Sequence, residues 1–335
     1  MQVAVLGAGS WGTALALVLS KNKNISLTIY HHNNYYDTNK TFKYFDTIQI
    51  PDDISITNDK NDIKNYDIYF IVQPTEYVYD SLSWINDNSK SKNPIIVNCA
   101  KGFSYDHKMT FYQVVCENFI NLKDNYCVLS GPSHAEEVIK KLPTAVVVAS
   151  NNQSKAKLIQ DLFSTNYFRI YTNSDVIGVE VGAACKNIIS IAAGICIGLN
   201  YGENTIAALI SRGLNEMKLL GTYFGANEET FNGLSGIGDL TVTAYGKHSR
   251  NRAFGVLIGK GYQLDNAYKE IKMYVEGISA TKTVHRILNN NKIIMPIVSQ
   301  VYSILFDKKN PEIAINQLMD RKLKHEMIKQ RGSNE

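Results

Sequence analysis

One apolar segment of the chain carries a lysine, an acid and an amide, residue types that can move a proton or hold a charged ligand. The segment DVIGVEVGAACKNIISIAAGICIGLN extends from Asp175 to Asn200 and contains Glu180, Lys186 and Asn187. Apolar surroundings lower the pKa of a lysine toward neutrality, where it can act as a general acid or base. The alternative is a lysine whose ammonium group reaches solvent along its apolar stem. The segment alone does not decide between the two.

The same segment predicts the central helix of a folded domain. Asp175 suits the start of a helix, and Gly198 with Asn200 suits its end. A helix that is apolar on every face is buried in a large core or in a membrane. Glu180 and Lys186 would be costly within a bilayer, so a core helix without membrane insertion is favoured over a membrane anchor.

A glycine-rich turn near the N-terminus predicts a dinucleotide site. The apolar strand QVAVL leads into GAGSWG, in which Gly7, Gly9 and Gly12 form a G-x-G-x-x-G pattern ahead of a helical run. Gly7 permits the tight turn, Gly9 lets the backbone approach a pyrophosphate, and Gly12 lets the helix pack on the strand. The N-terminus of that helix would face the negative charge.

The end of the second strand bears on which cofactor is bound. That strand ends near Tyr30 and is followed by His31, His32 and two asparagines; the first acid is Asp37. In NAD-specific proteins, an acid at about this point binds the ribose hydroxyls. Because no carboxylate is placed to repel a 2′-phosphate, we predict that the protein accepts NADP, with NAD as a second candidate. An ordinary polar strand end is the alternative.

Three other clusters could bind an anionic substrate. Lys101 follows the strand at residues 95–98, at the strand end where doubly wound sheets bind ligands. The turn SGPS, at residues 130–133, is expected to start a helix with free backbone donors. GLSGIGDL carries Asp239, and SRNRAFG presents Ser249, Arg250 and Asn251 at a helix start that suits a phosphate. A capped, solvated helix start is the alternative for the last cluster.

The pattern along the chain predicts two domains and a tail. Up to Tyr171, apolar strands alternate with helices, which indicates a parallel, doubly wound sheet. Residues 33–61 are predicted to be a loop with a short helix. Beyond Tyr171 the pattern is helical. We therefore expect an α/β Rossmann-type domain at residues 1–173, an all-α substrate and catalytic domain at 174–322, and a charged tail at 323–335.

Composition narrows the function classes. The 335 residues have a net charge of +4, too weak to indicate nucleic-acid binding but suited to a small anion. The five cysteines form no C-x-x-C pair and the seven histidines show no metal-ligand spacing, so we predict reduced thiols, a cytoplasmic location and no metal. The N-terminus lacks the features of a signal peptide.

Taken together, these motifs resemble the bacterial-type NAD(P)-dependent glycerol-3-phosphate dehydrogenases. The resemblance runs from about Gln2 to Leu318 through segments that stand in the family's order. The segments are GAGSWGTALA, AKGF, SGPS, GVEVGAACKN, SRGLNEM, GLSGIGDL, SRNRAFG and VEG. The family implies a cytosolic, usually dimeric enzyme that interconverts dihydroxyacetone phosphate and sn-glycerol 3-phosphate with NAD(P)H. It also implies a supply of glycerol 3-phosphate for phospholipid synthesis.

The resemblance further implies overlapping cofactor and substrate sites. Besides the glycines, the implied cofactor residues are Ser10, Trp11, His31, His32, Lys101, Ala135, Arg250, Tyr274 and Glu276. The implied substrate residues are Lys101, Gly131, Ser133, Lys186, Asp239, Ser249, Arg250 and Asn251. Lys186 would be the general acid/base, with Lys101 as a second cation and Asp239 orienting the lysine.

Two other function classes are weighed against this one. The first is a related two-domain dehydrogenase for a hydroxy acid or a sugar acid, against which GLSGIGDL and SRNR count. The second is a cofactor-binding sensor without catalysis. Loss of Lys101, Lys186 or Asp239 would favour the sensor, and all three are present.

Overall fold

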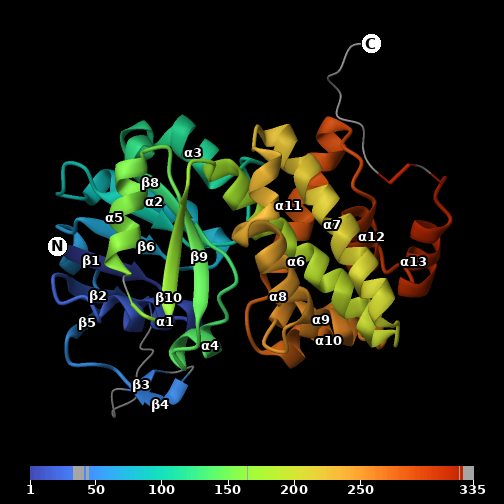
Figure 1. Cartoon of the computed structure of the whole chain (residues 1–335), viewed down its shortest axis with the longest axis horizontal. Helices are drawn as coiled ribbons and strands as arrows, with labels where there is room; N and C mark the ends of the chain where they lie inside the picture. The colour runs from blue at the N-terminus through green and yellow to red at the C-terminus, as the bar shows by residue number, and fades with distance from the viewer. Residues whose placement is uncertain (33–40, 43–44, 164, 324, 327–335) are drawn as a thin grey trace.

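An eight-stranded sheet with helices on both faces lies beside a group of helices in the computed structural model of the chain (Figure 1). The structure describes residues 1–32, 41–42, 45–163, 165–323 and 325–326. The strand order is β10-β9-β8-β7-β6-β1-β2-β5. The strands are β1 (Gln2–Leu6), β2 (Ser26–Tyr30), β5 (Ile54–Thr57), β6 (Ile68–Ile71), β7 (Ile95–Asn98), β8 (Tyr126–Ser130), β9 (Thr144–Ala149) and β10 (Phe168–Asn173).

Helices cover the two faces of this sheet. One face packs against α1 (Ser10–Leu19), α4 (Ala135–Ile139) and α5 (Gln153–Leu162), and the other against α2 (Val78–Asn88) and α3 (Phe111–Asn118). Alternate residues of β1 supply the two cores, since successive side chains of a strand point to opposite faces. The short 3-10 helices of this sheet region are η1 (Lys60–Ile63), η2 (Thr75–Tyr77) and η3 (Ile120–Asn125). The predicted doubly wound, Rossmann-type sheet is confirmed.

Two strands, however, run against the predicted direction. β8 pairs antiparallel with β9, placing Ser130 opposite Val147, and β10 is parallel to β9. The expectation of a wholly parallel sheet was therefore wrong for β9 and β10. A parallel pair needs a crossover of a dozen or more residues, usually a helix that packs across the sheet. The segment between β8 and β9 contains only the short α4, which packs on α1.

The loop predicted for residues 33–61 is partly strand. Residues 33–40 and 43–44, including Asp37, lie outside the described residues. In the remainder, β3 (Thr41–Phe42) pairs antiparallel with β4 (Phe45–Gln49), and β5 extends the main sheet beside β2. The predicted short helix is η1, at the end of the segment. The alternation of β-branched residues in DTIQI and ISIT carried a strand signal that the polar composition obscured.

The helical region is arranged around α6 (Val176–Gly198), near the centre of that region in Figure 1. The elements that follow it are α7 (Glu203–Phe224), η4 (Glu228–Asn232), the π-helical η5 (Leu234–Gly238), α8 (Asp239–Tyr245), α9 (Arg250–Gly259), α10 (Leu264–Ile271), α11 (Glu276–Asn291), α12 (Pro296–Phe306) and α13 (Pro311–Met319). The all-α character predicted beyond Tyr171 is confirmed. Of the charged tail, only Leu323, His325 and Glu326 are described.

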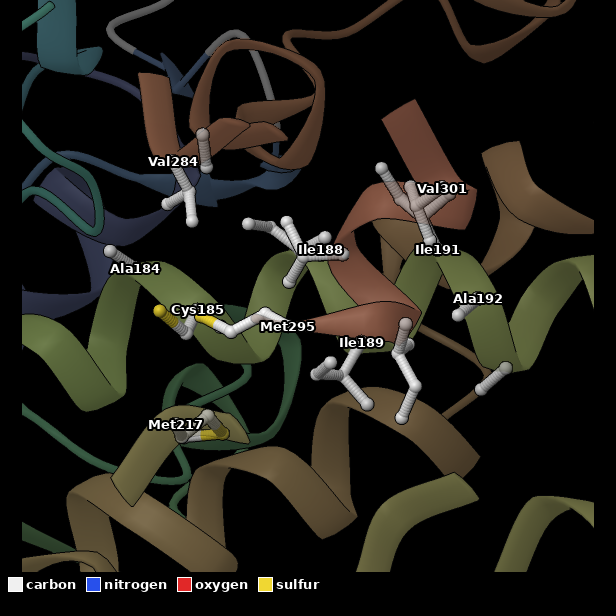
Figure 2. Close-up of a cluster of buried hydrophobic side chains, with 14 of the residues drawn as sticks. Ala184, Cys185, Ile188, Ile189, Ile191, Ala192, Met217, Val284, Met295 and Val301 are labelled. Carbon is white, nitrogen blue, oxygen red and sulfur yellow. The ribbon is translucent and has the colours of Figure 1, made fainter. Parts of the chain in front are cut away.

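Helix α6 is a core helix. Its N-cap Asp175 accepts a hydrogen bond from the backbone N–H of Gly178 at 2.8 Å. Its apolar side chains point toward several neighbours, among them Met217 of α7, Val284 of α11 and Val301 of α12 (Figure 2). The helix is long and apolar enough to cross a membrane, yet 89% of its most apolar stretch is buried inside the protein. Its apolar side chains therefore pack against other helices of the same chain.

Glycines bring α6 and α9 into backbone contact. A Cβ atom built on Gly194 would lie 2.1 Å from the carbonyl oxygen of Arg252 and 2.9 Å from the Cα of Gly255. One turn later, a Cβ on Gly198 would lie 2.9 Å from the Cα of Gly259. Because glycine alone permits this approach, the register between the two helices is fixed. The N-terminus of α9, with its polar cluster, is thereby held beside the middle of α6.

Candidate active site

The carboxyl ends of five parallel strands bring the predicted groups to one edge of the sheet. β8, β7, β6, β1 and β2 are consecutive and parallel. The glycine turn follows β1, Lys101 follows β7, and Gly131 follows β8, so all three lie along the same edge. Ligands bind at this edge in doubly wound sheets. Helix α6 is the first element of the helical region to follow the sheet along the chain.

The glycine turn has the shape that a dinucleotide pyrophosphate requires. Gly7 has φ of +122°, and a Cβ on Gly12 would lie 1.9 Å from the Gly7 carbonyl oxygen, so both positions exclude a side chain. A Cβ on Gly9, by contrast, would meet no described atom within 4 Å, which leaves space beside the backbone. Gly9 is also the N-cap of α1, whose first turn, Ser10 and Trp11 included, contains no acid. The turn therefore fits NAD(P)H.

The two histidines at the end of β2 have different environments. His31 is buried, and its backbone N–H donates to the carbonyl oxygen of Thr57 at 3.1 Å. Burial lowers the pKa of its imidazole, which favours the neutral ring. His32 is exposed at the rim. Asp37, the first acid after β2, lies outside the described residues.

Two lysines from different regions of the fold share one buried carboxylate. Lys186 of α6 donates from Nζ to Oδ1 of Asp239 at 2.7 Å, and Lys101 donates to Oδ2 of the same residue at 2.8 Å. Lys186 is 5% exposed and Asp239 1%. Lys186 also donates to Oγ1 of Thr243 at 2.8 Å, and Lys101 to the Gly131 carbonyl oxygen at 3.2 Å. These contacts exclude the alternative that the ammonium group of Lys186 reaches solvent.

This arrangement brings the pKa of Lys186 close to neutrality. Burial is the largest effect and Lys101 adds to it, while Asp239 opposes both; the net result lowers the pKa of Lys186 to about 8. Burial raises the pKa of Asp239, but the two ammonium groups outweigh it and the net pKa of the carboxyl is lowered. Asp239 therefore stays ionised at neutral pH. Lys186 can exist in both protonation states near pH 8, as a general acid/base must.

A chain of amides connects Lys101 to the polar start of α9. The side-chain amide of Asn187 donates to the Lys101 carbonyl oxygen at 3.3 Å and to Glu276 Oε2 at 3.2 Å. Asn251 donates to Asn187 Oδ1 at 2.9 Å and accepts the backbone N–H of Gly277 at 2.9 Å. The predicted residues of α6, α9 and α11 thus form one network around the lysine pair.

The remaining predicted residues lie at the edges of this network. Arg250 donates to the backbone carbonyl of Tyr274 at 3.2 Å, and Ser249 caps α9 by accepting the backbone N–H of Arg252 at 3.2 Å. Ser133 donates to the carbonyl oxygen of Gly131 at 2.9 Å.

The helix expected from Pro132 differs from the one observed. α4 begins three residues later, at the buried Ala135, with His134 as its N-cap, and is five residues long. The prediction that a helix starts at Pro132 was therefore wrong. The polar groups of the turn approach Lys101 through the Gly131 carbonyl instead.

Sequence reasoning assigned no place in the site to two residues that contact the lysine pair. Thr243 bonds Lys186 and also donates to the backbone carbonyl of Asp239 at 2.6 Å. Its position four residues after Asp239, on the same face of α8, was the available signal. Asn187 was noticed as a polar residue in an apolar helix, but only the structure shows that it contacts Lys101 and Glu276.

Comparison with known families agrees with this site. The model of the NAD-dependent glycerol-3-phosphate dehydrogenase N-terminus matches residues 2–156, and the model of the corresponding C-terminus matches residues 175–316. The two matches together contain every site residue named above. They also fall on the sheet region and the helical region, respectively.

Individual proteins are similar over almost their whole length. A glycerol-3-phosphate dehydrogenase (NAD(P)+) of Thermoanaerobacter sp. (strain X514) is 45% identical over 98% of this chain and 99% of its own. A glycerol-3-phosphate dehydrogenase (NAD(P)+) from Halothermothrix orenii is 44% identical over 97% of this chain and 96% of its own length. The crystal structure of a glycerol-3-phosphate dehydrogenase from Coxiella burnetii, 35% identical, covers 96% of this chain and 99% of its own with a TM-score of 0.86. The chain therefore belongs to the NAD(P)-dependent glycerol-3-phosphate dehydrogenase family of oxidoreductases.

Proposed function

We propose that the protein interconverts dihydroxyacetone phosphate and sn-glycerol 3-phosphate, with Lys186 as the general acid/base. The observation that supports this most strongly is the buried Lys186, with a pKa lowered to about 8, on a carboxylate that it shares with Lys101. Reduction of a ketone requires one proton at the C2 oxygen, and oxidation of the alcohol requires its removal. A lysine with this pKa can do both near neutral pH.

The other side chains bind and orient the reactants in this proposal. When bound, NAD(P)H supplies a hydride to C2 in reduction, and NAD(P)+ accepts one from C2 in oxidation. Gly7, Gly9 and Gly12 with Ser10 and Trp11 would bind its pyrophosphate end, and His31, His32, Ala135, Tyr274 and Glu276 would contact the rest. Gly131, Ser133, Ser249 and Asn251 would surround the substrate. Lys101 would stabilise negative charge at the C2 oxygen while Lys186 transfers the proton.

Steady-state kinetics test the proposal and the cofactor preference together. We expect reduction of dihydroxyacetone phosphate with both NADPH and NADH, and a lower KM for NADPH because no described carboxylate follows β2 closely. A strong preference for NADH would contradict the NADP prediction. Turnover of a hydroxy acid or sugar acid instead of this substrate would favour a related dehydrogenase, and cofactor binding without any turnover would favour a sensor.

Arg250 is proposed to bind the substrate phosphate, a charge that does not react. Arg250→Ala should therefore raise the KM for dihydroxyacetone phosphate by roughly 10- to 100-fold and change kcat less, since it removes binding that the ground state and the transition state share. The KM for unphosphorylated dihydroxyacetone should change little. Lys260→Ala, at the other end of α9, is the control. An unchanged KM for the phosphorylated substrate would place the phosphate elsewhere.

The wider setting follows from the same proposal. The product would supply glycerol 3-phosphate for phospholipid synthesis. All five cysteines lie within the described residues and none is paired, which suits the reducing environment of a cytoplasm. The homodimer implied by the family resemblance stays a prediction.

A further inference from the structure

A buried carboxylate outside the amide network joins the sheet region to α6. Glu180 is 2% exposed. Its Oε1 accepts hydrogen bonds from the Tyr126 hydroxyl at 2.5 Å and from the Asn98 amide at 3.4 Å. Its Oε2 accepts the backbone N–H of Tyr112, the second residue of α3, at 2.9 Å. One side chain of α6 thus holds β7, β8 and α3 together.

A second contact, about two helical turns further along α6, fixes the same segment of the sheet region. Asn187 stands seven residues after Glu180, so both side chains lie on one face of α6. Asn187 donates to the carbonyl oxygen of Lys101, while Asn98 accepts the backbone N–H of Ala100 at 3.1 Å. The short segment that presents Lys101 is therefore attached to α6 at both of its ends.

The geometry of the lysine pair depends on this attachment. Lys101 comes from the sheet region, whereas Lys186 and Asp239 come from the helical region. Two ammonium groups repel each other, yet both lie within 2.8 Å of oxygens of the one Asp239 carboxylate that attracts them, so the position of Lys101 depends on where β7 holds its backbone. A small displacement of β7 would move Lys101 and leave Lys186 in place.

We propose that Glu180 is a positioning residue for the reaction: its carboxylate fixes β7 against α6 and thereby holds the Lys101 ammonium beside Asp239 and Lys186. The proposal rests on the proposed function for its effect on turnover. Burying a carboxylate is costly, and hydrogen bonds offset only part of that cost. Burial accordingly raises the pKa of Glu180, and the donors from Tyr126, Tyr112 and Asn98 oppose that change.

Glu180→Gln is the first test, because it keeps the size of the side chain but replaces one acceptor oxygen with a donor. Either the Tyr126 hydroxyl or the Tyr112 N–H then loses its acceptor, and β7 loosens. We expect kcat for reduction to fall by roughly 10- to 100-fold, as misplacement of a reacting group by about 1 Å can do. We also expect the pKa of Lys186 to rise by about one unit, because a neighbouring positive charge has moved away.

The pKa of Lys186 can be measured without any turnover. The rate of its reductive methylation is followed against pH by peptide mass spectrometry, in the absence of substrate. If the wild-type protein failed to reduce dihydroxyacetone phosphate, the proposed function would fail, yet the methylation profile would still report on Glu180. An upward shift in the variant supports the positioning role in either case.

Glu216→Gln is the matched control. Glu216 is another buried carboxylate, and it accepts the backbone N–H groups of Ile297 at 2.7 Å and Val298 at 3.1 Å at the start of α12. This control should lower Tm and leave kcat and the pKa of Lys186 unchanged. The same result for Glu180→Gln, a lower Tm with no change in either quantity, would overturn the proposal.

A second variant keeps the test decisive if Glu180→Gln does not fold. Tyr126→Phe removes only the hydroxyl that bonds Glu180 at 2.5 Å. It should shift the pKa of Lys186 upward and lower kcat, both less than Glu180→Gln does. Where Glu180→Gln does fold, the double variant should show changes in kcat and in the pKa of Lys186 that are smaller than the sum of the two single effects, because both substitutions break one network. Full additivity, or no shift in Tyr126→Phe, would contradict the proposal.

Discussion

Lys186→Ala should lower kcat for reduction of dihydroxyacetone phosphate by about 10²- to 10⁴-fold, the usual contribution of a positioned general acid. The side chain is buried against Asp239 and Thr243, so no water molecule is expected to replace it in the same geometry. The cofactor turn at Gly9 lies on a different element, and the affinity for NADPH, measured by fluorescence titration, should change little.

The dependence of the rate on pH should change as well. Under the proposed mechanism, wild-type reduction uses the protonated lysine, so its rate should fall as pH rises through about 8, whereas the rate of oxidation should rise.

Lys186→Met separates chemistry from packing. It fills most of the space of the lysine stem without a titratable group, so any loss that it shares with Lys186→Ala is chemical. Near-normal turnover in either variant would remove Lys186 from the mechanism. Loss of NADPH binding in both would instead indicate that the helical region had been disrupted.

Asp239→Asn should lower kcat for reduction at neutral pH by about 10²-fold. Asp239 raises the pKa of Lys186, whereas burial and Lys101 lower it. Without the carboxylate only the lowering effects remain, so the pKa of Lys186 should fall below about 8 and the general acid should be deprotonated at neutral pH. The midpoint of the reduction profile should move to lower pH. Oxidation, which requires the neutral lysine, should lose less.

Asp175→Asn provides the comparison for this change. Asp175 also accepts several hydrogen bonds, from the backbone N–H groups of Gly178 and Asn227 and from the Thr230 hydroxyl, but it lies at the start of α6. It should lower Tm without moving the midpoint of either profile. A midpoint for Asp239→Asn that stayed in place, or moved to higher pH, would show that Asp239 does not set the pKa of Lys186.

The elements of the fold that the sequence predicted well are those with local signals. The turn at Gly7, Gly9 and Gly12 constrains the backbone within six residues, and α6 follows from an N-cap and an unbroken apolar run. The direction of β9 has no such signal. It depends on whether the chain crosses the sheet between β8 and β9, and the short α4 could be recognised only once its packing on α1 was known.

Local sequence signals also identified some residues of the candidate site and not others. Lys186 was identified by its place in an apolar helix, Lys101 by its place after a strand, and Asp239 as the acid of a glycine-rich segment; the structure brings the two lysines onto the Asp239 carboxylate. Thr243 was not identified because threonines are common in helices and carry no charge. Its place in the site depends on its contacts with Lys186 and Asp239, which only the structure shows. Glu180 was visible as an acid inside an apolar helix, but its partners on β7, β8 and α3 are 54 to 82 residues away in sequence. Such contacts arise from tertiary packing alone.

The glycine contact between α6 and α9 has a consequence for domain motion. Where two backbones touch, no side chain can change rotamer to let the helices slide, so the helices should move as a single rigid body. Lys186 and the polar start of α9 travel with that body, and Lys101 with the sheet. Any movement of the helices away from the sheet would therefore leave Lys186 and the polar start of α9 at a constant separation. It would alter their distances from Lys101 and from a cofactor bound at the glycine turn.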